Sequence, residues 1–240
     1  MLLLIQFFTK IPINKSLACE KSDFRKSLWF LPVLGGLIGA VQGLAFYLSQ
    51  MVFPVSIAII FAMVTEYIIT GGFHMDGYAD ASDGFFSGRR GEEAYKIMKD
   101  GVVGPFGALS LIILVLLQFE GLKIIAFPLV FVLLGIVSKT VILMLAYRSK
   151  AYGGGLGGTI TNNVSVITLI FSLLIMNGMF IYSMGIYKGL VCFIIISIFI
   201  MLFRKFSYRI IGGISGDQYG FVHEISKVII ILIMGYAKIA

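Results

Sequence analysis

Side chains able to do chemistry are concentrated in residues 71–100, which read GGFHMDGYADASDGFFSGRRGEEAYKIMKD. Asp76, Asp80 and Asp83 follow one another at i, i+4 and i+7, so in a helix their carboxylates lie on one face. Neighbouring carboxylates repel one another unless a cation neutralises them, and hard oxygen ligands suit Mg²⁺ or Mn²⁺ with phosphate oxygens completing the coordination. The spacing therefore predicts a divalent metal site that holds phosphate. The alternative is a solvated polar helix whose acids pair with nearby arginines and lysines.

His74 and Asp100 extend this candidate site. His74 can serve as a general base for a hydroxyl, as a donor to phosphate or as a metal ligand, although a lone histidine is more often a hydrogen-bonded structural residue. Gly88 and Gly91 are expected to end the helix, which would let Asp100 fold back toward the other aspartates. The segment thus combines metal ligands with a group able to move a proton.

A second polar segment is rich in glycine. Residues 153–158 read GGGLGG and are flanked by Arg148 and Asn162. Backbone N–H groups in such a loop suit phosphate or amide contacts, although a flexible linker would have the same composition. Both interpretations stay open at this stage.

Three ionisable residues fall in or beside apolar runs. Glu66 is expected to have a partner and to support the aspartates, because an ionised carboxylate inside a membrane is costly. Lys139 is expected to extend its ammonium harmlessly to the membrane surface. His223, at the start of the last apolar run, is expected to be structural.

The elements that position these residues must be membrane helices. Of the 240 residues, 59% are hydrophobic and 13% are charged, and the mean hydropathy is +1.00. An ordinary soluble domain has roughly a quarter of its residues charged. The composition predicts an all-α, polytopic integral membrane bundle that forms a single domain over residues 1–240. Residues 27–105 would hold the first two spans and the acidic segment, and residues 106–240 the remaining spans and loops.

Seven apolar runs are candidates for membrane spans, although several are shorter than the 20 residues that a bilayer needs. They are Leu28 to Leu48, Val52 to Thr70, Phe106 to Phe119, Ile124 to Tyr147, Val164 to Met184, Gly189 to Phe203 and Ile225 to Ala237. The opening MLLLIQFF is expected to be a retained interfacial segment.

The distribution of positive charge predicts the orientation. With seven spans, one side of the membrane receives most of the lysines and arginines, and the other receives only Lys123, Lys188 and Lys238. By the positive-inside rule, the N-terminus and all the long loops are cytoplasmic. The acidic segment is then a cytoplasmic active site in a multi-pass protein of the cell membrane.

The sequence favours neither nucleic-acid binding nor cysteine chemistry. The basic residues are scattered instead of forming the concentrated patch that nucleic acid requires, so no nucleic-acid partner is expected. Cys19 and Cys192 have no CxxC spacing or ligand cluster, so neither a disulfide nor a thiolate metal site is expected.

The motifs resemble those of a known family. GGFHMDGYADASDGFF followed by IMKDGVVGPFGALSL closely resembles the signature of the cobalamin synthases, the adenosylcobinamide-GDP ribazoletransferases of bacteria and archaea. FFTKIPI, LWFLPVLGGLIGAVQGL, YRSKAYGGGLG and IGGISGDQYGFVHE also occur in the expected order. The resemblance therefore covers nearly the whole chain.

The resemblance implies an activity and a set of site residues. Such enzymes join α-ribazole, or its 5′-phosphate, to adenosylcobinamide-GDP, releasing GMP with the help of Mg²⁺ to complete the nucleotide loop of vitamin B12. Association with other enzymes of nucleotide loop assembly is a further expectation. The positions that match the family's acidic residues and histidine are His74, Asp76, Asp80, Asp83, Asp100 and Asp217.

Roles follow from this chemistry as hypotheses. Asp76, Asp80 and Asp83 are expected to bind Mg²⁺, with Asp100 and Asp217 as further ligands of the metal or its water. A pyrophosphate linkage needs cations to bind its oxygens and stabilise the GMP leaving group. The candidate phosphate contacts are Arg89, Lys96, Lys99, Arg148 and Asn162. His74 or one of the aspartates would take the proton from the attacking hydroxyl.

The chain departs from the family pattern in its central loop. Tyr152, Gly153 and Gly154 stand where acids are usual, and Lys139 stands where an arginine is common. A lysine cannot reproduce the bidentate grip of an arginine on phosphate. Three other functions remain alternatives: a CDP-alcohol phosphatidyltransferase, because Asp80-x-x-Asp83-Gly partly matches its acidic motif, an ion-coupled transporter, and a scaffold in a B12 assembly complex.

Overall fold

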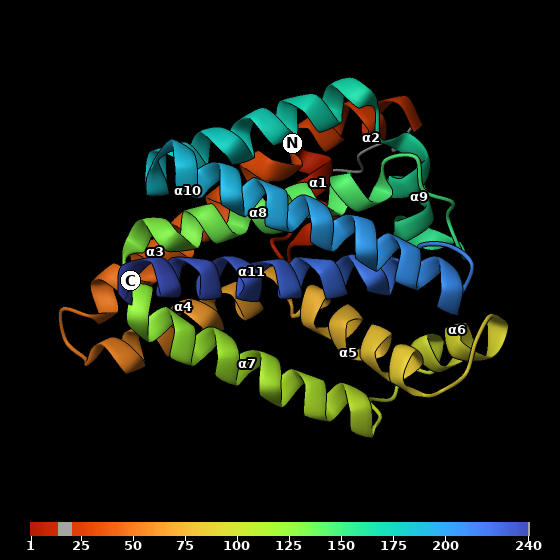
Figure 1. Ribbon diagram of the computed structural model, residues 1–240, viewed down its shortest axis with the longest axis horizontal. Coiled ribbons are helices and arrows are strands. Elements are labelled where there is room, and N and C mark those ends of the chain that lie inside the picture. The colour runs from red at the N-terminus through yellow and green to blue at the C-terminus, as the bar shows by residue number, and fades with distance from the viewer. Residues whose placement is uncertain (14–20, 240) are drawn as a thin grey trace.

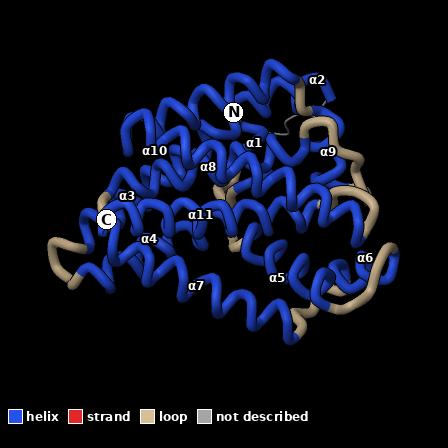
Figure 2. The backbone as a smooth tube through the Cα atoms, in the orientation of Figure 1, coloured by secondary structure: helices blue, strands red, loops and turns tan. Residues whose placement is uncertain are grey.

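The computed structural model describes residues 1–13 and 21–239, and this part of the chain is built from helices without strands (Figure 1, Figure 2). The expected all-α class is thereby confirmed. Cys19 lies outside the described residues, and Cys192 is a buried free thiol. The helices in chain order are α1 (Leu2–Phe8), α2 (Lys21–Ser27), η1 (Leu28–Phe30), α3 (Leu31–Ser49), α4 (Val55–Thr70), α5 (Phe73–Phe86), α6 (Glu92–Lys99), α7 (Pro105–Ile125), α8 (Pro128–Ala146), α9 (Gly155–Asn163), α10 (Val166–Ile210) and α11 (Gly216–Ile239).

Long apolar helices account for the expected membrane spans. Five segments are long and apolar enough to cross a membrane: residues 23–49, which end with α3, and helices α7, α8, α10 and α11. Helices α4 and α5 meet the same criterion as a pair bent by 89°, which raises the number to six. The expected seven is therefore approximate, and the difference depends on how α10 is counted.

Helix α10 contains a reversal of the chain at Gly185. Its 45 residues are interrupted there by a non-helical conformation, with φ 79° and ψ 169°. A Cβ placed on Gly189 would lie 3.2 Å from backbone atoms of Phe180 and Ile181, so the second half folds back along the first (Figure 1). The two apolar runs expected at residues 164–184 and 189–203 are these two halves.

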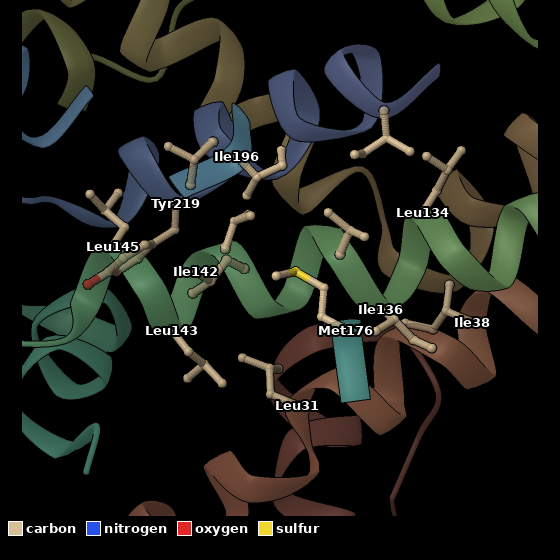
Figure 3. Close-up of a cluster of buried hydrophobic side chains, with 14 of the residues drawn as sticks. Leu31, Ile38, Leu134, Ile136, Ile142, Leu143, Leu145, Met176, Ile196 and Tyr219 are labelled. Atoms are coloured by element: carbon tan, nitrogen blue, oxygen red, sulfur yellow. The ribbon is translucent and has the colours of Figure 1, made fainter. Parts of the chain in front are cut away.

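Close packing of α3 against α8 forms the centre of the bundle. A Cβ on Gly35 would lie 2.1 Å from the carbonyl oxygen of Gly135, and one on Gly39 would lie 2.2 Å from that of Phe131. Only glycine allows the two backbones to approach so closely. Figure 3 shows side chains from α3, α10 and α11 meeting around α8, among them Leu31 and Ile196.

Helix α5 departs sharply from α4 and packs between α7 and α11 (Figure 1). Gly71 and Gly72 join the two helices with φ values of 67° and 71°, a conformation that favours glycine. Where α11 contacts α5, a Cβ on Gly220 of α11 would lie 2.6 Å from the carbonyl oxygen of His74. The glycines therefore set both the bend and the contact that place the acidic segment beside the start of α11.

The N-terminal segment is part of the bundle and does not merely rest on its surface. Leu4 and Phe8 of α1 are buried, and the Phe8 ring packs edge-on against Phe73. The amide of Lys10 donates to the carbonyl of Ile69 at 2.7 Å. The segment expected at the membrane interface thus covers the junction of α4 and α5.

Candidate active site

Three carboxylates meet where α5 crosses α11. Asp76 is exposed, and Asp80 and Asp217 are half-buried. A Cβ on Gly77 would lie 3.2 Å from the Cα of Asp217, so the two backbones are nearly in contact at this point. The negative charges of Asp76 and Asp217 both act on Asp80. We call Asp76, Asp80 and Asp217 the acidic group.

Lys99, the last residue of α6, lies in the acidic group. Its ammonium contacts both oxygens of Asp217, at 2.8 Å and 2.7 Å, and its charge also acts on Asp80. The Lys99 side chain is 47% exposed. A tethered cation therefore occupies a place beside carboxylates from two helices, and oxygen donors of this kind suit a divalent ion such as Mg²⁺.

Asp83 has a different environment from the acidic group. It is buried, and its two carboxylate oxygens accept hydrogen bonds from the backbone amides of Gly104 and Gly107, each at 2.8 Å. These amides belong to the start of α7, where N–H groups lack partners within the helix. A Cβ on either glycine would overlap the carboxylate. The structure thus uses Asp83 to cap α7, and its role as a metal ligand stays a prediction.

The other residues expected in the site are more dispersed. Asp100 and Lys96 are exposed on or just after α6, with Asp100 directly following Lys99. Arg89 pairs with Glu93 at 3.5 Å, and both side chains are largely exposed. Their proposed contacts with metal or phosphate stay predictions, because these side chains face solvent.

The glycine-rich loop, residues 153–158, lies close to the acidic group. Helix α9 begins at Gly155, so most of this segment is helical and not the loop that its composition predicts. Gly157 approaches the backbone of Gly216, the residue before Asp217, so closely that a Cβ on it would lie 2.5 Å away. The loop lines a hollow of about 570 Å³ that also includes the exposed Asn162. Arg148, at the start of this loop region, is exposed and has a φ of 56°. The loop and the late glycine motif, far apart in sequence, therefore form adjoining walls.

Helix α6 joins the loop to the acidic group. The Tyr95 hydroxyl lies against Gly153, and the Tyr95 and Tyr152 rings pack edge-to-face with centroids 5.0 Å apart. Tyr152 donates from its hydroxyl to Glu92 at 3.2 Å. Tyr152 and Gly153, which depart from the family pattern, thus contact α6.

A chain of buried polar side chains lies beneath the acidic group. The Lys139 ammonium is 2.5 Å from Nε2 of His74 and 2.9 Å from Nε2 of His223, and the two imidazole rings stack with centroids 3.8 Å apart. Phe8 covers this arrangement, with its ring centroid 5.6 Å from the Lys139 ammonium. Lys139 is 2% exposed. The expectation that it extends to the membrane surface was wrong, because two imidazole nitrogens solvate its charge inside the bundle.

The chain continues through two ion pairs. Nδ1 of His223 lies 3.1 Å from Glu224, whose other oxygen is 2.8 Å from the Lys227 ammonium. Lys227 in turn contacts Glu66 at 3.0 Å, which identifies the partner expected for that buried carboxylate. Gln118 of α7 donates to Glu224 at 2.9 Å. We call His74, Lys139, His223, Glu224, Lys227 and Glu66 the buried network.

The buried network balances its own charge. It contains two glutamates and two lysines, so its formal charges cancel when the histidines are neutral; both glutamates contact Lys227, and Lys139 contacts the two histidines. The ligand atoms of Glu66, His223 and Glu224 are close enough together to hold a metal ion. Lys227, however, already bonds to both carboxylates, so its ammonium supplies the cation there. An adjoining cavity of about 20 Å³, lined in part by Gln42, has room for one water.

The sequence indicates only part of this network. His74, Glu66, Lys139 and His223 were each recognisable as ionisable residues, but Lys227 was not singled out. The spacing of His223 and Lys227 at i and i+4, next to a polar residue in another span, was the available signal.

Comparison with known proteins identifies the family. The family model described as "Cobalamin-5-phosphate synthase" matches residues 1–235. An "Adenosylcobinamide-GDP ribazoletransferase" of Clostridium botulinum (strain Okra / Type B1) is 34% identical over 237 residues, covering 97% of this chain and 96% of the relative. Its counterpart of the same name in Clostridium tetani (strain Massachusetts / E88) is 36% identical over 238 residues, covering 97% and 94%. No solved structure matches. The chain belongs to the cobalamin-5-phosphate synthase family.

Proposed function

We propose that this protein joins α-ribazole or α-ribazole 5′-phosphate to adenosylcobinamide-GDP, releasing GMP and forming adenosylcobalamin or its 5′-phosphate. Membership of the family and the names of the relatives support the transferase reaction. The observation that carries the site is the acidic group, in which Asp76 and Asp80 of α5 meet Asp217 of α11 beside the cationic Lys99. This arrangement suits a highly charged phosphate substrate.

Mg²⁺ is the proposed cofactor, and Asp76, Asp80 and Asp217 are the residues that would hold it. When bound, the ion neutralises charge on the pyrophosphate oxygens as GMP leaves. Asp100, exposed next to Lys99, is a further candidate ligand through water. Asp83 contributes by fixing the start of α7 against α5, since both of its oxygens are hydrogen-bonded to backbone amides.

The chain's own residues would bind the phosphates and remove a proton. Lys99 of α6 presents its ammonium beside the acidic group, and the exposed Lys96, Arg89, Arg148 and Asn162 are further candidates for phosphate contacts. The attacking ribose hydroxyl must lose its proton as the new oxygen–phosphorus bond forms. We favour an aspartate of the acidic group as acceptor, because the His74 ring is 3% exposed and its Nε2 faces Lys139.

Charge asymmetry supports a location in the cell membrane with the site on the cytoplasmic side. Helices α5, α6 and α9 all lie toward one end of the bundle (Figure 1), and most of the lysines and arginines fall in the segments predicted for one side of the membrane. The substrates would therefore be taken from the cytoplasm. Association with other enzymes of nucleotide loop assembly remains part of this proposal.

The test is GMP release and cobalamin formation by detergent-purified protein supplied with adenosylcobinamide-GDP and either acceptor, with Mg²⁺ or with EDTA. We expect product only with Mg²⁺, and a loss of at least about 100-fold in Asp80→Asn and Asp217→Asn proteins. Glu120→Gln is the matched control, because Glu120 is an exposed acid on α7 that pairs with Lys123. Folded protein that forms no product with either acceptor, or that keeps full turnover in EDTA, would overturn the proposal.

A further inference from the structure

The ion pair between Lys99 and Asp217 is open to two competitors. A metal ion would compete with Lys99 for the carboxylate, and a phosphate group would compete with Asp217 for the ammonium. Its ammonium donates a hydrogen bond to one oxygen of Asp217 at 2.8 Å and lies 2.7 Å from the other, and Asp217 is 12% exposed whereas Lys99 is 47% exposed. A divalent ion held by Asp217 in the position of this ammonium would repel it, because two cations at such short separation raise each other's electrostatic energy. An ion in that position therefore requires the ammonium to move away.

The structure allows this movement without a change in the fold. Lys99 is the final residue of α6, and Gly101, with a φ of 67°, follows just beyond the end of the helix. Helix α6 is anchored through Met98 and Ala94, which are buried and lie against Gly84 of α5. Rotation about the side-chain bonds of Lys99 is enough to release Asp217, while Met98 keeps the helix in place.

A released Lys99 would lie on the side of the glycine-rich loop. Its ammonium is 5.9 Å from the centre of the Tyr95 ring, and the Tyr95 hydroxyl touches Gly153. The hollow lined by Gly153, Gly154 and Asn162 opens from this loop. The side chain thus stands between the acidic group and the wall expected to receive phosphate.

We propose that Lys99 is an exchangeable internal cation: it neutralises Asp217 in the metal-free protein, and binding of the divalent ion transfers its ammonium to the diphosphate of the substrate. This inference rests on the proposed function and adds to it a coupling between two ligands. Metal binding would prepare the nucleotide site, because the ion would neutralise phosphate charge and its binding would free a lysine to bind phosphate. Linkage requires the reverse as well, so the nucleotide diphosphate tightens metal binding.

The sign of the effects separates exchange from a structural role. If Lys99 exchanges, its removal tightens metal binding, because a competing cation is lost, and weakens nucleotide binding, because a phosphate contact is lost. If Lys99 only fastens α6 to α11, its removal loosens the site and weakens both. An exposed ion pair is weak, so we expect metal affinity to rise by about fivefold. Loss of a charge-assisted hydrogen bond should lower nucleotide affinity by about tenfold.

The experiment measures binding, not turnover. Free Mn²⁺ is followed by electron paramagnetic resonance during titration of detergent-purified full-length protein, and adenosylcobinamide-GDP binding is followed by corrinoid absorbance in equilibrium dialysis without acceptor. The variants are Lys99→Met and the charge-conserving Lys99→Arg. Lys123→Met, which removes one positive charge from an exposed position on α7, is the control. Thermal unfolding of each variant verifies that it is folded.

Opposite shifts in Lys99→Met, with metal affinity near that of the wild type in Lys99→Arg and Lys123→Met, are the expected result. Unchanged or weaker Mn²⁺ binding by folded Lys99→Met would overturn the exchange while leaving the proposed transferase intact. Equal tightening by Lys123→Met would also overturn it, because the change in overall charge would then explain the effect. Absence of Mn²⁺ binding in the wild type would overturn both the metal proposal and the exchange.

Discussion

Replacement of Lys227 tests whether the buried network holds the bundle together. Its ammonium is 2.8 Å from Glu224 and 3.0 Å from Glu66, and the three side chains are only 7%, 2% and 19% exposed. In Lys227→Met the side-chain volume is nearly conserved, but two carboxylates remain without their cation. Removal of one partner from a buried ion pair costs about 3–5 kcal/mol. For a chain of this length, such a loss corresponds to a fall of roughly 6–20 °C in the melting temperature.

The chain contains a matched control for this variant. Lys123 pairs with Glu120 at 2.8 Å with i, i+3 spacing, which is the distance and spacing of Lys227 and Glu224. The side chains of Lys123 and Glu120, however, are both exposed. Lys123→Met should cost under about 1 kcal/mol because water screens an exposed pair. The two variants remove the same side chain, so the difference between them measures the effect of burial.

Unfolding can be followed through a cysteine already present. Cys192 is fully buried, so a thiol-reactive fluorophore reports its exposure on heating, in a Cys19→Ser background. The double variant Lys227→Met with Glu66→Gln restores neutrality and should recover at least half of the lost stability. A melting temperature of Lys227→Met within about 2 °C of the wild type would refute the reasoning. So would a double variant whose loss equals the sum of the two single losses.

Two further variants test the packing that surrounds the site. Asp83→Ala should lower the free energy of unfolding by about 2 kcal/mol, because it leaves buried amides of α7 unpaired. Asp80→Asn should change turnover but not the melting temperature. Equal melting temperatures for the two variants would contradict the capping role of Asp83. Gly39→Leu should prevent the close approach of α3 and α8 and lower the free energy of unfolding by about 1–3 kcal/mol or more. Gly178→Leu is the control, because a Cβ at Gly178 meets nothing within 4 Å, and it should leave the melting temperature unchanged.

The sequence identified the helices better than their partners. The runs at residues 164–184 and 189–203 were recognisable because Gly185 separates two stretches of sufficient hydropathy. The last run, expected from Ile225, begins in fact at Gly216, because hydropathy excludes the polar residues before it. His223 and Glu224 enter the bundle nevertheless, since their charges and hydrogen bonds are satisfied by other helices. The hydropathy of a single segment does not take into account the hydrogen bonds and ion pairs that other helices supply.

The aspartate spacing shows a second limit. Asp76, Asp80 and Asp83 do share a helix, as the i, i+4, i+7 pattern predicts. Seven residues nevertheless advance a helix by about 10 Å, so the same face can meet different neighbours at its two ends. Asp83 meets the amides of α7, whereas Asp76 and Asp80 meet Asp217, which was recognised only through the resemblance. Which neighbour lies opposite each turn is decided by the crossing of helices.

Polar residues on two sides of α5 explain how this helix is held in a membrane protein. Its outward-facing carboxylates, Asp76 and Asp80, cannot anchor it, because repulsion among them favours separation from Asp217. On the inner side, His74 joins a network that is neutral overall and reaches three other helices through Lys139, Glu224 and Glu66. The buried contacts offset the repulsion and fix the register of α5 against α11. The acidic group can therefore remain crowded enough to require a cation, which is the property that the proposed chemistry uses.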